Sequence, residues 1–121
     1  MKVMTMSTQQ QMPESELHLR IDALLQTIQE QLDHVDADID SELSSGILTL
    51  TFESGSKIIV NRQTPNRELW VAAKSGGYHF RFVAPSWTDT RSGESLERLL
   101  SRVITEQAGA RVELQLDQIP Q

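Results

Sequence analysis

Cysteine is absent from this chain of 121 residues. Without a thiol the chain can form no disulfide, no thiolate metal site and no cysteine nucleophile. If the protein handles metal, the ligands must therefore be carboxylates, with or without imidazoles.

Long hydrophobic runs are also absent, and none approaches the roughly 18 residues of a membrane span. The segment 1–13 is polar and rich in Gln, with no apolar signal segment, and we expect it to be a disordered lead in a cytoplasmic protein. The 38% of hydrophobic residues can form one small core. We assign a single domain to residues 14–116 and a loose tail to residues 117–121.

Basic residues are scarce in the first part of the chain. Residues 14–42 contain nine acidic residues and one basic residue, Arg20, whereas acids and bases nearly balance elsewhere. The formal net charge is -6. Such a one-sided acidic field repels nucleic acid and attracts cations or a basic protein surface.

Sequence motifs of common enzymes are missing. There is no Gly-rich phosphate loop, no HExxH and no nucleophile elbow, and His18, His34 and His79 are scattered. We therefore expect a non-enzymatic protein. The D-x-D-x-D pattern that begins at Asp36 does not match an EF-hand calcium loop either. Ser41 stands where that loop needs Gly, and Ile47 stands where it needs Glu.

Two helices are predicted by apolar residues at helical spacing. The first covers residues 14–35, after Pro13. The second follows Ser92, which we expect to cap it, and ends at Gly109. Alternating Val112, Leu114 and Leu116 then indicate an extended tail that lies along the groove between the helices.

The segment 57–82 alternates apolar and polar residues in short runs, the pattern of an antiparallel sheet with one buried face. Gly76-Gly77 is predicted as a turn within it. Further strands are expected before it and at Trp87, whose side chain we assign to packing. The prediction is an α+β fold: a two-layer sandwich with two helices on one face of about six antiparallel strands.

The other face of this sheet is unusual for a solvated surface, because it holds Trp70 beside amide side chains. A large aromatic residue in such a place indicates a docking surface for a partner. The alternative is that a helix or loop covers Trp70.

A row of acidic residues leads from the first helix into the first strand. Asp38, Asp40 and Glu42 alternate with Ile39 and Leu43, so the carboxylates point one way and the apolar residues point to the core. Hard oxygen donors of this kind bind divalent cations weakly and with poor selectivity. A merely solubilising acidic face is the alternative.

A longer set of residues carries a family resemblance. In order and spacing, this sequence is similar to the frataxin family in its bacterial form over residues 15–109. The matching residues are Asn61-Arg62-Gln63, Pro65, Trp70, Ala72, Lys74 and Gly76-Gly77-Tyr78-His79-Phe80, with Gly46–Phe52 before them and Trp87 and Asp89–Glu94 after them.

The resemblance implies a weak iron-binding protein of iron–sulfur cluster assembly that binds the cysteine desulfurase and the scaffold protein. It acts there as iron donor, as regulator of the desulfurase, or as both. It is mostly a monomer that metal can assemble into oligomers, it binds Fe2+ or Fe3+, and other divalent cations can substitute. The implied metal-binding residues form the acidic ridge, which is Glu30, Asp33, Asp36, Asp38, Asp40 and Glu42, with Asp22 and His18 as weaker additions. The implied partner-binding residues are Asn61, Gln63, Trp70 and His79.

The sequence departs from the family pattern at His34, where an acid is common, and at Val35, where an aromatic residue is common. His34 is then either an iron ligand or a bystander. Two other functions stay open: a ferroxidase with iron-storing assemblies, and a pure protein-interaction regulator with incidental metal affinity. No Glu-x-x-His pairs of a di-iron centre are present, which disfavours the first.

Overall fold

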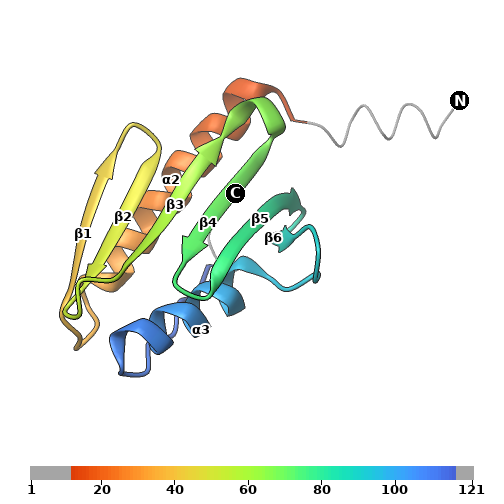
Figure 1. Ribbon diagram of the computed structural model, residues 1–121. Helices are drawn as coiled ribbons and strands as arrows, with labels where there is room; N and C mark the ends of the chain where they lie inside the picture. Colours follow the sequence, from red (N-terminus) through yellow and green to blue (C-terminus); the bar gives the residue numbers. More distant parts are fainter. Residues whose placement is uncertain (1–11, 117–121) are drawn as a thin grey trace, which may run out of the picture.

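The computed structural model describes residues 12–116, and the predicted disordered lead and loose tail lie almost wholly outside them. Within these described residues, two α-helices flank six strands that pair in sequence order, each antiparallel to the next (Figure 1). The elements are α2 (Glu14–Leu32), β1 (Ile39–Ser44), β2 (Ile47–Phe52), β3 (Lys57–Gln63), the 3-10 turn η1 (Thr64–Asn66), β4 (Glu68–Ala73), β5 (Gly76–Val83), β6 (Ser86–Asp89) and α3 (Leu96–Ala108). None of the described helices is long and apolar enough to cross a membrane.

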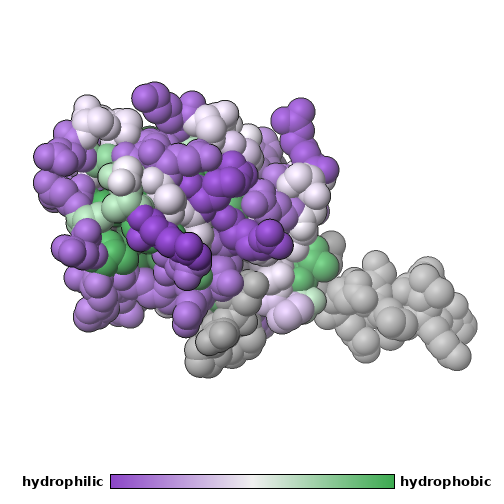
Figure 2. All heavy atoms as spheres, turned by 90° about the horizontal axis from the view of Figure 1, so that it is seen from below, coloured by the Kyte–Doolittle hydropathy of each residue, from purple (hydrophilic) through white to green (hydrophobic). Residues whose placement is uncertain are grey.

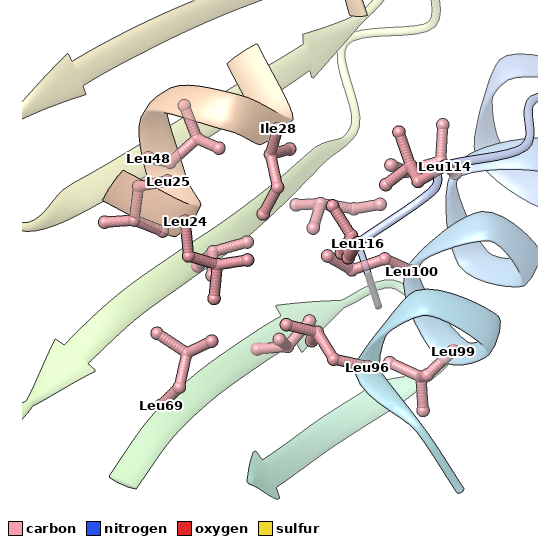
Figure 3. Close-up of a cluster of buried hydrophobic side chains, with 14 of the residues drawn as sticks. Leu24, Leu25, Ile28, Leu48, Leu69, Leu96, Leu99, Leu100, Leu114 and Leu116 are labelled. Carbon is pink, nitrogen blue, oxygen red and sulfur yellow. The ribbon is translucent and has the colours of Figure 1, made fainter. Parts of the chain in front are cut away.

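Both helices pack on one face of the sheet, as predicted. Residues of α2, α3 and alternate positions of the central strands form one buried cluster, in which Leu25, Leu69 and Leu100 are fully buried (Figure 3). Burial of apolar area is the main favourable term in folding, so this cluster holds the two layers together. Among residues 12–116, no helix lies on the opposite face of the sheet, which we call the open face.

The tail fills the gap between the two helices. Val112, Leu114 and Leu116 are buried, and Figure 3 shows Leu114 and Leu116 beside α3. The backbone N–H of Leu114 donates to Ser101 Oγ at 2.9 Å, and that of Leu116 donates to Glu97 Oε1 at 2.6 Å. The extended tail predicted from its alternation is confirmed. Seen from below, the surface is mostly hydrophilic, with only small hydrophobic patches (Figure 2).

Helix α2 ends three residues earlier than predicted, at Leu32. Beyond it the backbone N–H groups of His34 and Val35 reach back only three residues, to the carbonyls of Gln31 and Leu32. No basic residue lies in the last turn, and Asp33 stands at the negative end of the helix dipole. This local chemistry disfavours one more helical turn.

The prediction that Ser92 caps the second helix is wrong. The N-cap is Ser95, whose side chain accepts a hydrogen bond from the backbone N–H of Arg98. Ser92 instead donates to Asp89 Oδ2 and accepts from the N–H of Glu94, so it closes the turn that precedes the helix. Gly109 ends α3 in the left-handed conformation, as predicted.

The predicted turn at Gly76-Gly77 is also wrong, because both glycines belong to β5. Ala73 pairs with Gly76 and Ala72 with Gly77, which leaves Lys74 and Ser75 as the two-residue loop. Hairpin loops of two residues are common because their twist matches that of the strands. The correction shifts the loop by two residues and sets which side chains of β4 and β5 lie opposite each other.

Candidate functional site

The acidic ridge follows one border of the sandwich, from the end of α2 to the edge strand β1. Glu30 lies in the last turn of α2 and Asp33 is its C-cap, while Asp40 and Glu42 lie on β1. Asp36 and Asp38 belong to the connection between the two elements. All six side chains are exposed.

Within residues 12–116, no ion pair involves any of the six ridge carboxylates. Nor do three or more Asp, Glu or His side chains converge there as in a preformed metal site. The ridge is therefore an open row of carboxylates without cationic partners in the described part of the chain. His34 is exposed beside it. Unneutralised like charges repel one another, so this arrangement costs some stability.

Asp22 and His18 have a different environment from the ridge. Arg62 Nη1 lies 2.6 Å from Asp22 Oδ1, and His18 Nε2 lies 3.6 Å from Asp22 Oδ2. The Arg62 guanidinium reaches Asp22 from β3, across the space beside Gly46. The carboxylate of Asp22 already has a cationic partner, whereas the ridge carboxylates have none among the residues that the structure describes.

The four residues predicted to bind a partner all lie on the open face. Asn61 on β3 is opposite Trp70 on β4, and Trp70 is opposite His79 on β5. Gln63 is two residues further along β3, opposite Glu68. Among the described residues, neither helix lies on this face, so a helix does not cover Trp70. The open face thus carries a half-buried aromatic ring flanked by two half-buried amides.

Trp70 is held by two neighbours. Its ring stacks on that of His79 with centroids 4.4 Å apart and an interplanar angle of 9°. Its indole Nε1 donates a hydrogen bond of 2.7 Å to Glu68 Oε1. Arg81 Nε donates to the other oxygen, Oε2, at 3.2 Å, and His79 Nδ1 lies 3.7 Å from Oε1. One carboxylate therefore contacts three side chains of the open face.

Sequence reasoning missed Glu68 and Arg81. Alternation along β4 could have placed Glu68 on the face of Trp70, two residues away. The pairing with Arg81 depends on the register between β4 and β5, which the misplaced turn obscured. The sequence therefore indicates the face on which Glu68 lies, but not the strand register that places Arg81 beside it.

The contacts of Glu68 lower the pKa of its carboxyl group below the usual value, first through the hydrogen bond from the Trp70 indole and then through Arg81 and the charge of His79, against an opposing effect of burial. A carboxyl group with a depressed pKa stabilises the fold above its unfolded pKa, and this contribution is lost as the pH falls through the folded value. We expect the indole Nε1–H resonance of Trp70 to titrate at a pH below that of an ordinary Glu. NMR between pH 6 and pH 2 measures this, and a midpoint at or above the ordinary Glu value contradicts it.

The ridge and the open face meet at β1. On the neighbouring strand β2, Thr51 lies opposite Asp40 and Thr49 lies opposite Glu42. Thr49 also pairs with Ile59 on β3, which is on the same face as Asn61. These residues alternate with the buried ones, so the two carboxylates lie on the open face. Asp40, Glu42 and Trp70 therefore share one face of the sheet.

A helix-backed antiparallel sheet with an acidic edge and a half-buried Trp on its open face defines a small α/β-sandwich domain. The family model described as the frataxin-like domain matches residues 10–110. The chain belongs to the frataxin-like family.

Two similar proteins, from Paraburkholderia phymatum and Paraburkholderia xenovorans, bear the name iron–sulfur cluster assembly protein CyaY. Each is 53% identical to this chain, over 85% and 81% of it and over 98% and 93% of the relatives. Among solved structures, the frataxin of Psychromonas ingrahamii matches with a TM-score of 0.79 and 35% identity, over 84% of this chain and 97% of that one. A trimeric frataxin from the yeast Saccharomyces cerevisiae, complexed with ferrous iron, matches with a TM-score of 0.61 and 29% identity, over 82% and 88%.

Proposed function

We propose that this chain is a non-enzymatic, iron-binding protein of iron–sulfur cluster assembly that works through the acidic ridge. The observation that supports this most directly is the row of six exposed carboxylates that have no cationic partner within residues 12–116. The names of the two Paraburkholderia relatives support the pathway, and the ferrous complex of the yeast relative supports the metal.

Iron is here a cargo, held by carboxylate oxygens with several waters retained. Oxygen donors suit Fe2+ and Fe3+ as well as other hard cations, and an open row of them binds weakly and without strong selection. Glu30 and Asp33 would contribute from α2, and Asp40 and Glu42 from β1, with Asp36 and Asp38 between them. Asp22 is a weaker candidate because Arg62 already neutralises it.

The proposed partners are the cysteine desulfurase and the iron–sulfur scaffold protein. An acidic ridge that meets a basic patch gives fast association that weakens with salt. Because Asp40 and Glu42 lie on the open face, a partner at the ridge also comes near Asn61 and Trp70. Iron on the ridge would change its charge, so metal binding and partner binding should be coupled. The cytoplasmic location, the monomeric state and metal-driven assembly are part of the same proposal.

Two NMR titrations of labelled protein test the proposal, one with Fe(II) under anaerobic conditions and one with purified cysteine desulfurase. We expect both to perturb residues 30–42, and we expect the desulfurase signal to weaken as salt is added. If the desulfurase binds but iron perturbs nothing in this segment, the protein is a regulator and not an iron carrier. Absence of both responses would overturn the proposed function and leave only the fold.

A further inference from the structure

We infer that Glu68 is a positioning residue of the open face, which fixes the Trp70 ring against His79 in the orientation that a protein partner meets. That a partner docks on this face rests on the proposed function. The ordering of the Trp70 ring by Glu68 needs no partner. The ordering and the docking can therefore be tested, and can fail, separately.

The geometry of the carboxylate carries the inference. Oε1 accepts the 2.7 Å hydrogen bond from the indole, and Oε2 accepts the bond from Arg81, so both oxygens are fixed. The side chain of Glu68 is only 14% exposed, whereas that of His79 is 49% exposed and that of Arg81 is 56% exposed. Glu68 is therefore more buried than His79 and Arg81, and its two fixed oxygens can orient the groups that they contact.

A fixed ring matters because docking on a mobile one would cost affinity. Ordering one rotamer-rich side chain on binding costs about 2- to 12-fold in the dissociation constant. A Trp that is already ordered avoids this loss, and Trp is among the residue types enriched at binding hot spots. Glu68 thus contributes to affinity without needing to touch the partner.

The same contacts determine which parts of the Trp70 ring remain available to a partner. The indole N–H is occupied by Glu68 and one ring face by His79, so Trp70 offers its other face and its ring edge. In the part of the chain that the structure describes, the amides of Asn61 and Gln63 make no side-chain hydrogen bond and are free to pair with polar groups of the partner. The geometry suits an apolar side chain on the ring, bordered by main-chain amides of a protein.

The experiment compares Glu68→Ala with Glu68→Gln, with Glu53→Ala as the control because Glu53 is an exposed acid outside the open face. Glu68→Gln keeps an acceptor for the indole and loses the charge. In the free protein, we expect the Trp70 Nε1–H to exchange with water at least tenfold faster in Glu68→Ala than in wild type, with Glu68→Gln between them. The Nε1–H of the buried Trp87 should not change, which shows that the variants are folded. Unchanged exchange at Trp70 in Glu68→Ala overturns the inference.

The second arm measures binding to the purified desulfurase with its scaffold protein. Where wild type binds, Glu68→Ala should weaken the dissociation constant about 3- to 10-fold. Glu53→Ala should leave it unchanged. Equal affinity of Glu68→Ala and wild type would show that the ordered ring does nothing for docking and would overturn that part of the inference. If wild type itself does not bind, the proposed function fails, and the exchange measurement still decides whether Glu68 orders Trp70.

Discussion

Conversion of Asp36, Asp38, Asp40 and Glu42 to their amides should lower the affinity for Fe(II) at least tenfold and, at the same time, raise the melting temperature. The affinity falls because the metal loses both charge and oxygen donors, and tenfold corresponds to only about 1.4 kcal/mol. The melting temperature rises because these exposed carboxylates repel one another and have no cationic partner within the described residues. Relief of roughly 1–2 kcal/mol corresponds to about 3–8 °C.

The matched control changes the net charge by the same amount away from the ridge. It replaces four exposed acids by Gln, namely Glu14, Glu16, Glu53 and Glu113. Anaerobic calorimetry gives the affinity, and thermal unfolding monitored by circular dichroism gives the melting temperature. Equal loss of iron affinity in both variants would mean that the overall field attracts the metal and the ridge does not. A ridge variant that binds as wild type would remove the ridge from the proposal.

Gly46→Ala should destabilise the fold by about 2–3 kcal/mol. Gly46 is in the left-handed region, with φ of 79°, where a Cβ is unfavourable. A Cβ there would also lie 2.6 Å from Cζ of Arg62. The guanidinium would have to move and would lose its contact with Asp22, which joins the sheet to α2. Urea unfolding measures the change.

Two further variants separate the causes of that loss. Gly55 has φ of 93° and open space where its Cβ would be, so Gly55→Ala should show the backbone cost alone, about 1 kcal/mol. In an Arg62→Ala background, Gly46→Ala should cost no more than Gly55→Ala, because the clash is gone. If Gly46→Ala costs the same with and without Arg62, the guanidinium is not what confines this position.

The turn chemistry explains why Gly46 is sensitive. Ser45 also has positive φ, at 51°, and the two residues form the loop between β1 and β2. Positive φ at both central residues is typical of the hairpin turn whose twist matches the strands. The backbone carbonyl of Gly46 then accepts from the N–H of Arg62, which ties the hairpin to β3. The turn between β1 and β2 and the Arg62–Asp22 ion pair that joins β3 to α2 therefore both depend on Gly46.

Much of the ridge and of the open face was predictable because it depends on periodicity. Asp40 and Glu42 alternate with Ile39 and Leu43 over a few consecutive residues, so local spacing alone predicts their common face. Trp70 is on the open face for the same reason. Predictions of this kind need only the period of a strand or helix, and the structure agrees with these placements.

What failed does not follow from periodicity. Ser92 and Ser95 are equally plausible caps by residue type, and the local turn separates them: Ser92 donates to Asp89, three residues earlier, while Ser95 caps α3. The pairing of Glu68 with Arg81 required the true loop at Lys74-Ser75, because a shift of register changes every cross-strand neighbour.

The sequence by itself determined the two helices, the buried and open faces of the sheet, and the acidic composition of one border, since each follows from a local repeat and from residue chemistry. Only the tertiary structure decided that Arg62 neutralises Asp22 across 40 positions, that Glu68 holds Trp70 and Arg81, and that the β1 acids share a face with Trp70. The physical reason is that strand register and helix placement set these distances, and both are fixed by packing of the whole core.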